Sequence, residues 1–243
     1  MANSLLSFYF FFELSLLPIS VIILGWGYQP ERLPAAFALL LYTIASSLPL
    51  LLLVLATGKA LPSSIVARTG GLPQARAISR GFALILIGAF LVKLPIFGVH
   101  IWLPLAHVEA PVFASMILAA LLLKLGGYGL LRLASAIPLQ SARLILIAGA
   151  LAGGVRISMV CVSQGDLKIV IAYSSVAHMA FVAAAALSQR AFAFQAATVI
   201  IVAHGISSSA IFAGANLIYL TNHTRMVTLF SSGLALVPSF TIL

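Results

Sequence analysis

Acidic residues and cysteine are scarce in this sequence. Only four of its 243 residues are Asp or Glu, 13 are Lys or Arg, and 7% are charged in total. A soluble domain usually has about 25% charged residues, so a soluble globular fold is excluded. The one cysteine, Cys161, excludes an internal disulfide. The chain also lacks the cysteines of an iron–sulfur cluster and any Gly-rich phosphate loop, so we expect it to bind no cofactor.

Apolar residues dominate the chain. They make up 63% of it, and the mean hydropathy is +1.19. A chain that crosses lipid must satisfy its own backbone hydrogen bonds, so we predict an all-α polytopic membrane protein with residues 1–243 in a single transmembrane domain. The formal charge of +9 is not gathered into a dense basic patch, so no nucleic-acid partner is expected. The first apolar run begins close to Met1, and we expect it to stay in the protein as an anchor.

The hydropathy pattern predicts seven to eight transmembrane helices, because about 20 residues of helix cross a bilayer. The longest polar connection covers residues 58–80. A final apolar run of 18 residues is short for a span. In order, the expected spans and the final run are 5–24, 33–57, 81–104, 112–131, 137–163, 166–187, 192–220 and 226–243.

Two lysines, Lys93 and Lys124, lie inside apolar spans. A charge at the bilayer centre costs about 2.5–3.5 kcal/mol on insertion scales, so two such charges indicate a function. Pro95 removes the hydrogen bond to the Leu91 carbonyl and predicts a helix broken at Lys93–Pro95. The adjacent Gly126 and Gly127 are expected to loosen the helix just beyond Lys124. Lysines beside weakened backbone suggest a buried path for ions or protons.

Glu13 and two histidines are further candidates for this path. Glu13 lies near the middle of the first span, and Pro18 frees the carbonyl of Leu14 beside it. His178 and His204 lie within later spans, each with serine hydroxyls one helical turn away. The alternative is that packing alone hides these polar groups. Their depth in the membrane favours a functional role.

Four other polar residues are less informative. We expect His100 to be buried in the second half of the broken helix, and His107 and Glu109 to lie at the membrane surface. The last two could ligate a metal, but no third ligand is at hand and no metal site is predicted. Arg156 interrupts the fifth span, and its position leaves open whether it reaches the interface or faces the protein interior.

Four stretches of the chain together resemble the chain 4 (bacterial chain M) family of antiporter-like membrane subunits in respiratory complex I, the proton-translocating NADH:ubiquinone oxidoreductase. The resemblance runs in order along nearly the whole chain, and the stretch from Lys93 to Arg132 is the most specific. The stretches read FFFELSLLPISVIILGWGYQPERLPAAFALLLYT, KLPIFGVHIWLPLAHVEAPVFASMILAALLLKLGGYGLLR, GDLKIVIAYSSVAHM and AHGISSSAIFAGANLIY.

The resemblance implies a role for each matched position. Glu13 corresponds to the family's essential intramembrane glutamate, and Lys93 to the lysine of its discontinuous helix, with which the glutamate pairs. Lys124 corresponds to the central lysine, and His178 and His204 to the connecting histidines. The chain would then be a subunit of the enzyme that moves protons, while NADH-to-quinone electron transfer takes place in other subunits.

The resemblance also implies surroundings for the chain. Its partners would be membrane lipids, other membrane-arm subunits of complex I and any chains that carry the family helices missing here, and it would not contact NADH. Its location would be the mitochondrial inner membrane, or alternatively a bacterial plasma membrane.

Departures from the family leave two other functions open. Family members are nearly twice as long, so either the gene is split or the subunit is truncated. Ser163 stands where arginine is common in the family, and Arg156 where neutral residues are usual. The first alternative is a subunit of a multi-chain sodium/proton antiporter, which shares both lysines. The second is a structural membrane subunit that does not conduct.

The orientation in the membrane is ambiguous. The loop from Gly25 to Arg32 is expected on the matrix or cytoplasmic side from the resemblance, whereas the positive-inside rule predicts the reverse. We follow the resemblance because few charges are involved. The loops after the first, third, fifth and seventh spans carry Arg32, Lys168 and Arg225. The loops after the even-numbered spans carry Lys59, Arg68, Arg76, Arg80, Arg132, Arg143 and Arg190.

Overall fold

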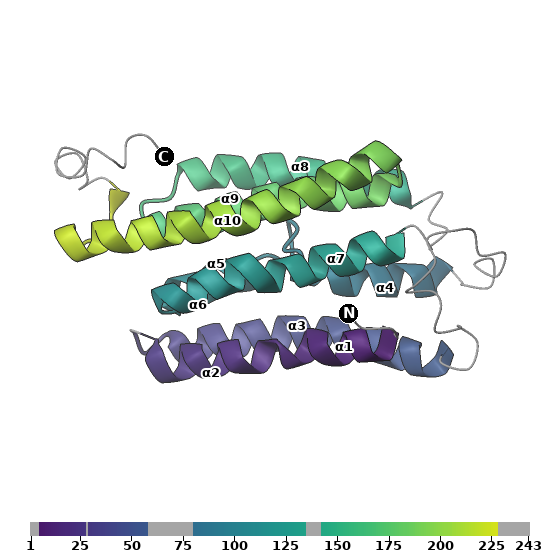
Figure 1. Cartoon of the computed structure of the whole chain (residues 1–243), viewed down its shortest axis with the longest axis horizontal. Coiled ribbons are helices and arrows are strands. Elements are labelled where there is room, and N and C mark those ends of the chain that lie inside the picture. The colour runs from purple at the N-terminus through teal and green to yellow at the C-terminus, as the bar shows by residue number, and fades with distance from the viewer. Residues whose placement is uncertain (1–4, 28, 58–79, 135–141, 228–243) are drawn as a thin grey trace.

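A computed structural model of the chain describes residues 5–27, 29–57, 80–134 and 142–227. Its helices lie roughly along one direction in three layers that follow the order of the chain (Figure 1). The first layer packs on the second and the second on the third, and these contacts bury one continuous apolar cluster. The predicted all-helical membrane fold is confirmed.

The first layer consists of α1 (Leu5–Leu14), α2 (Leu16–Trp26) and α3 (Arg32–Thr57). The first two form a single apolar span that is interrupted only at Ser15. This agrees with the expectation that Pro18 leaves the preceding turn without a hydrogen bond. The interruption falls directly beside Glu13.

The second layer contains the broken helix. It consists of α4 (Arg80–Lys93), α5 (Trp102–Glu109), α6 (Val112–Ile117), the π-helical segment η3 (Leu118–Leu122) and α7 (Leu123–Ala134). The predicted break is confirmed, because α4 ends at Lys93 and α5 begins only at Trp102. Gly98 has a φ of +100° within the connection, a conformation that favours glycine.

Two N–H groups donate to carbonyls that lose their usual helical hydrogen bonds at the break. The N–H of Ile96 approaches the carbonyl of Leu91, at 3.5 Å, in place of the donor that Pro95 lacks. The indole of Trp102 donates to the carbonyl of Val92 over 3.1 Å. Trp102 is 1% exposed, so it fastens the start of α5 to the end of α4 inside the core.

Two local predictions in this layer are wrong. His100 lies in the connection before α5, half-buried, and not within the second half-helix, because α5 starts after it and continues to Glu109. The irregular backbone near Lys124 comes before it, in η3, whereas Gly126 and Gly127 lie inside the regular helix α7.

The third layer consists of α8 (Arg143–Val162), α9 (Leu167–Ser188) and α10 (Ala191–Asn222). The fifth span was expected from residue 137, but α8 begins at Arg143, and residues 135–141 lie outside the described part. Asp166 caps α9 by accepting a hydrogen bond of 2.8 Å from the N–H of Lys168. Asp166 also pairs with Met226 in an isolated antiparallel bridge, while the rest of the final apolar run, from 228, lies outside the described residues.

Within the described residues, six helical segments are long and apolar enough to cross a membrane. The apolar α4 is too short for this criterion because the break divides the third crossing. Six spans and one interrupted crossing agree with the predicted number of helices.

The packing of α7 on α4 yields a first testable expectation. A Cβ atom at Gly129 would overlap the buried ring of Phe90. Gly129→Leu is therefore expected to push α7 away from α4 and to lower the amount of assembled protein several-fold. Gly149→Leu is the matched control, because nothing lies within 4 Å of a Cβ there. Quantifying both variants in purified membranes tests this, and equal amounts would contradict the close contact.

Candidate functional site

Lys93 and Glu13 meet at the interruptions of two helices. The Nζ atom of Lys93 lies 3.6 Å from Oε1 of Glu13, and the two side chains are 2% and 20% exposed. The ammonium donates a hydrogen bond of 2.7 Å to the carbonyl of Phe12 and lies 3.1 Å from the centre of the Phe12 ring. Lys93 is also the last residue of α4, where the helix dipole stabilises a positive charge. A carboxylate, a carbonyl, a ring and a helix end thus all stabilise one buried ammonium.

Helix α7 closes the space around Lys93. A Cβ atom at Gly126 would come within 3.2 Å of both the Lys93 Cβ and the Leu94 nitrogen. Any larger residue at position 126 would therefore press on the broken end of α4, and glycine allows the close approach of α7 without such a shift. Lys124 is two residues away on α7, so this approach brings the backbone of its helix against Lys93.

Lys124 and His204 form a second pair, between α7 and α10. The Lys124 Nζ lies 2.7 Å from Nδ1 of His204, which is 7% exposed. The ring of His178 on α9 lies next in line, 5.5 Å from the His204 ring between centroids and edge-on to it. His178 itself is exposed. Three helices thus contribute one titratable group each to a row of nitrogens.

The serine hydroxyls beside the histidines do not extend this row. Ser174 and Ser175 donate to the carbonyl of Ile171, and Ser207 and Ser208 donate to the carbonyl of His204. All four hydrogen bonds stay within the serine's own helix. Between Lys93 and Lys124, no hydrogen bond or ion pair joins the two pairs within the described ranges.

His107 is a titratable residue that is buried within the protein. We expected it at the membrane surface with Glu109, and at that end of α5 both side chains are covered by protein, at 0% and 4% exposure. The His107 ring stacks on Phe212 of α10, with centroids 4.6 Å apart. Neither of its ring nitrogens has a hydrogen-bond partner among the described residues. This burial cannot be predicted from the local sequence, because it depends on how α5 packs against α10.

Lys168, which we expected at the start of the sixth span among the charges near the loops, is a second buried cation. It is 8% exposed, and its Nζ donates to the carbonyls of Ala110, at 2.9 Å, and Val108, at 3.4 Å. It thereby caps the C-terminal end of α5. A lysine in the first turn of a helix opposes the helix dipole, and that unusual position is the signal that could have identified it.

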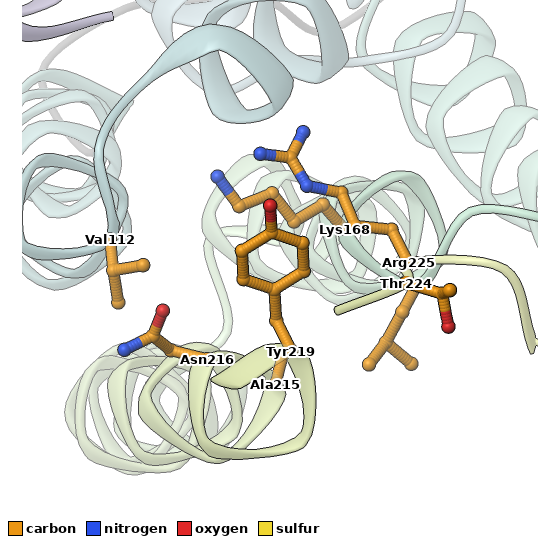
Figure 2. Close-up of a pocket in the computed structure, with 8 residues that line it drawn as sticks. Val112, Lys168, Ala215, Asn216, Tyr219, Thr224 and Arg225 are labelled. Atoms are coloured by element: carbon orange, nitrogen blue, oxygen red, sulfur yellow. The ribbon is translucent and has the colours of Figure 1, made fainter. Parts of the chain in front are cut away.

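A small cavity of about 20 Å³ lies beside Lys168 and has room for about one water molecule. Figure 2 shows the ammonium of Lys168, the hydroxyl of Tyr219 and the guanidinium of Arg225 gathered on one side of it. The Arg225 guanidinium lies 5.3 Å from the centre of the Tyr219 ring. Within the described residues, no group of three or more His, Cys, Asp or Glu could hold a metal ion.

Arg156 lies on the outward side of α8. It is exposed, and its guanidinium carbon lies 5.5 Å from the centre of the Phe97 ring. A cation–π contact at an exposed site contributes about 0.5–1 kcal/mol. A charge within a span costs about 2.5–3.5 kcal/mol, so this contact offsets only part of it. Of the two possibilities left open by the sequence, Arg156 therefore does not face the interior of the described part of this chain.

The chain matches the family model described as NADH:quinone oxidoreductase/Mrp antiporter, TM, over residues 2–242. The chain belongs to this family. Among individual proteins, it is 46% identical to NADH-ubiquinone oxidoreductase chain 4 of Lumbricus terrestris over 252 aligned residues, which cover 100% of this chain and 54% of the relative. It is 42% identical to NADH-ubiquinone oxidoreductase chain 4 of Latimeria chalumnae, and this match covers 99% of this chain and 53% of the relative. The chain thus spans about half the length of these relatives.

Two solved structures have a fold similar to that of this chain. A chain of respiratory complex I from Thermus thermophilus with bound NADH matches with a TM-score of 0.83 and 26% identity, covering 95% of this chain and 50% of that one. A chain of the Mrp complex from Dietzia sp. DQ12-45-1b matches with a TM-score of 0.78 and 28% sequence identity. This match covers 89% of this chain and 24% of that one. The resemblance to chain 4 is therefore confirmed, as are the antiporter-like fold and the multi-pass membrane class. The predicted mitochondrial location agrees with animal relatives.

Proposed function

We propose that this chain is part of the membrane arm of respiratory complex I and moves protons along Glu13, Lys93, Lys124, His204 and His178. NADH-to-quinone electron transfer would occur in other subunits and drive this movement. The observation that carries the proposal is the pair of buried contacts, Lys93 with Glu13 and Lys124 with His204, in a chain about 45% identical to chain 4 relatives. This chain's partners would be other membrane-arm subunits and lipids, and it would need no cofactor of its own.

Separation of Glu13 from Lys93 is the proposed driving step. A neighbouring carboxylate stabilises the charged form of a buried lysine, so Lys93 keeps its proton while Glu13 stays close. When Glu13 moves away, burial favours neutral Lys93, which releases a proton towards Lys124. Their 3.6 Å separation is longer than a hydrogen bond, so the carboxylate can withdraw while the Phe12 carbonyl still holds the lysine.

His204 and His178 would carry the proton onward. Imidazole can accept a proton on one nitrogen and release it from the other, and it exchanges protons near neutral pH. The Lys124 Nζ already contacts Nδ1 of His204, which leaves Nε2 for the next transfer. The irregular backbone of η3, just before Lys124, gives the lysine's helix freedom to adjust during transfer.

Ion-selective transport in vesicles tests the proposal. The complete complex containing this chain is purified, reconstituted and supplied with NADH and a quinone, while a pH-sensitive dye reports proton uptake. We expect NADH-dependent uptake that is unchanged when sodium is replaced by potassium. The proposal fails if the complex has no NADH dehydrogenase activity.

The alternative of a sodium/proton antiporter subunit has its own support, the 28% identity with the Mrp complex chain. It predicts sodium-dependent proton exchange without NADH in the same vesicles. The third possibility, a structural subunit that does not conduct, predicts that neutral substitutions at Lys93 and Lys124 leave all transport unchanged.

A further inference from the structure

The outward face of α8 is apolar except for Arg156. Helix α8 is a candidate membrane span of 20 residues, of which only about a fifth are buried against the rest of the chain. The most exposed apolar side chains on it are Leu144, Ile145, Val155, Met159 and Val162, at 70%, 74%, 60%, 72% and 87%. Arg156 is exposed among them. A ridge of apolar side chains with one cation in it therefore faces away from the described protein.

The guanidinium of Arg156 does not point to the near end of its helix. Arg156 lies six residues before Val162, about 9 Å from the end of α8 at 1.5 Å per residue. Its guanidinium lies over the ring of Phe97. Phe97 packs against Gly153, where an added Cβ would be 2.5 Å from the Phe97 Cβ, one turn closer to the middle of the span. The aromatic contact thus holds the charge at this depth, away from the interface.

No acidic side chain of the sequence pairs with Arg156. The sequence has four, and all of them lie in the described ranges. Glu13 faces Lys93, and Asp166 caps α9. Glu31 and Glu109 line a cavity together with residues of α3 and α5. An Asp or Glu side chain that neutralises Arg156 must therefore come from outside these 243 residues.

We propose that the outward face of α8 binds a transmembrane helix from outside these 243 residues, and that this helix presents an Asp or Glu side chain to Arg156. The apolar side chains on either side fit the apolar surface of such a helix, and guanidinium pairs with carboxylate through two parallel hydrogen bonds. A protein carboxylate suits this position better than a lipid phosphate, because phosphates lie at the membrane surface. The partner is thus recognised by one acid within an apolar span.

Cross-linking in the intact complex tests this directly. Arg156→Lys keeps the positive charge and places a primary amine there. A membrane-permeable carbodiimide then joins an amine to a carboxylate in contact with it, forming an amide and releasing a urea. We expect mass spectrometry to find the new lysine joined to an Asp or Glu in a transmembrane helix outside these 243 residues. Absence of this amide overturns the proposal.

Removal of the charge provides the second readout. If a carboxylate faces Arg156, Arg156→Leu leaves that acid unpaired in an apolar contact, and we expect at least a fivefold loss of assembled complex, with Arg156→Lys close to the parent. Val199→Leu, at a 66% exposed position on α10 away from this face, is the control and should have no effect. Assembly of Arg156→Leu at or above the parent level contradicts the proposal. Loss of assembly without the amide in the lysine variant would indicate a phospholipid instead, and would overturn it too.

Discussion

Replacing Lys93 by alanine, or Glu13 by glutamine, is expected to lower proton pumping at least tenfold while the complex still assembles. The alanine variant removes the ammonium that Glu13 and the Phe12 carbonyl hold in place. The glutamine variant keeps the shape of the side chain but cannot stabilise the charged lysine. After loss of Lys93, Glu13 can remain in place by taking up a proton, so the fold does not have to hold an unpaired charge.

The measurement is the ratio of protons taken up to NADH oxidised in reconstituted vesicles. Glu31→Gln is the matched control, since it makes the same chemical change at an exposed glutamate just before α3. It should leave the ratio unchanged. Retained pumping in both Glu13→Gln and Lys93→Ala would reject the proposed roles of this pair.

The second large effect on proton pumping is expected from substitutions in the contact between Lys124 and His204. Lys124→Met and His204→Ala are each expected to lower the pumping rate at least tenfold. Because the Nζ and Nδ1 atoms are 2.7 Å apart, the two residues should act as one unit. The double variant should then be no slower than the worse single one, whereas independent residues would give roughly the product of the two losses.

Initial rates of dye quenching in the four proteins of this cycle provide the test. Ser209→Ala on the same helix is the control, because its hydroxyl bonds to carbonyls of α10 itself. Its rate should match the parent. Losses that multiply in the double variant would show that Lys124 and His204 act on separate steps.

Local chemistry made much of the architecture predictable from the sequence. Proline cannot donate a hydrogen bond, and so Pro95 located the broken helix. Asp166 identified the start of α9 because a negative charge favours the N-terminus of a helix through its dipole, and the structure shows that its side chain also caps the helix. Charges in apolar spans identified Glu13, Lys93 and Lys124, and the resemblance to chain 4 indicated that the first two would meet. Their contact follows in the structure.

The remaining features of the site could not be predicted from the sequence, because they depend on packing between segments that are far apart in the chain. The burial of His107 depends on Phe212, more than a hundred residues later, and that of Lys168 on the carbonyls at the end of α5. The partners in these contacts cannot be read from the local sequence, although the position of Lys168 in the first turn of α9 is itself unusual. The exposure of His178 likewise depends on which sides of α9 and α10 pack together. The apolar composition of these two helices indicated only that each of them crosses the membrane.

The most direct test of the account is a density map of the assembled complex in which individual water molecules are visible. Our account predicts ordered waters that link the Nζ atoms of Lys93 and Lys124 and continue from His204 to His178. Apolar side chains that fill the space between the two lysines and leave no water there would contradict a continuous proton path through this chain.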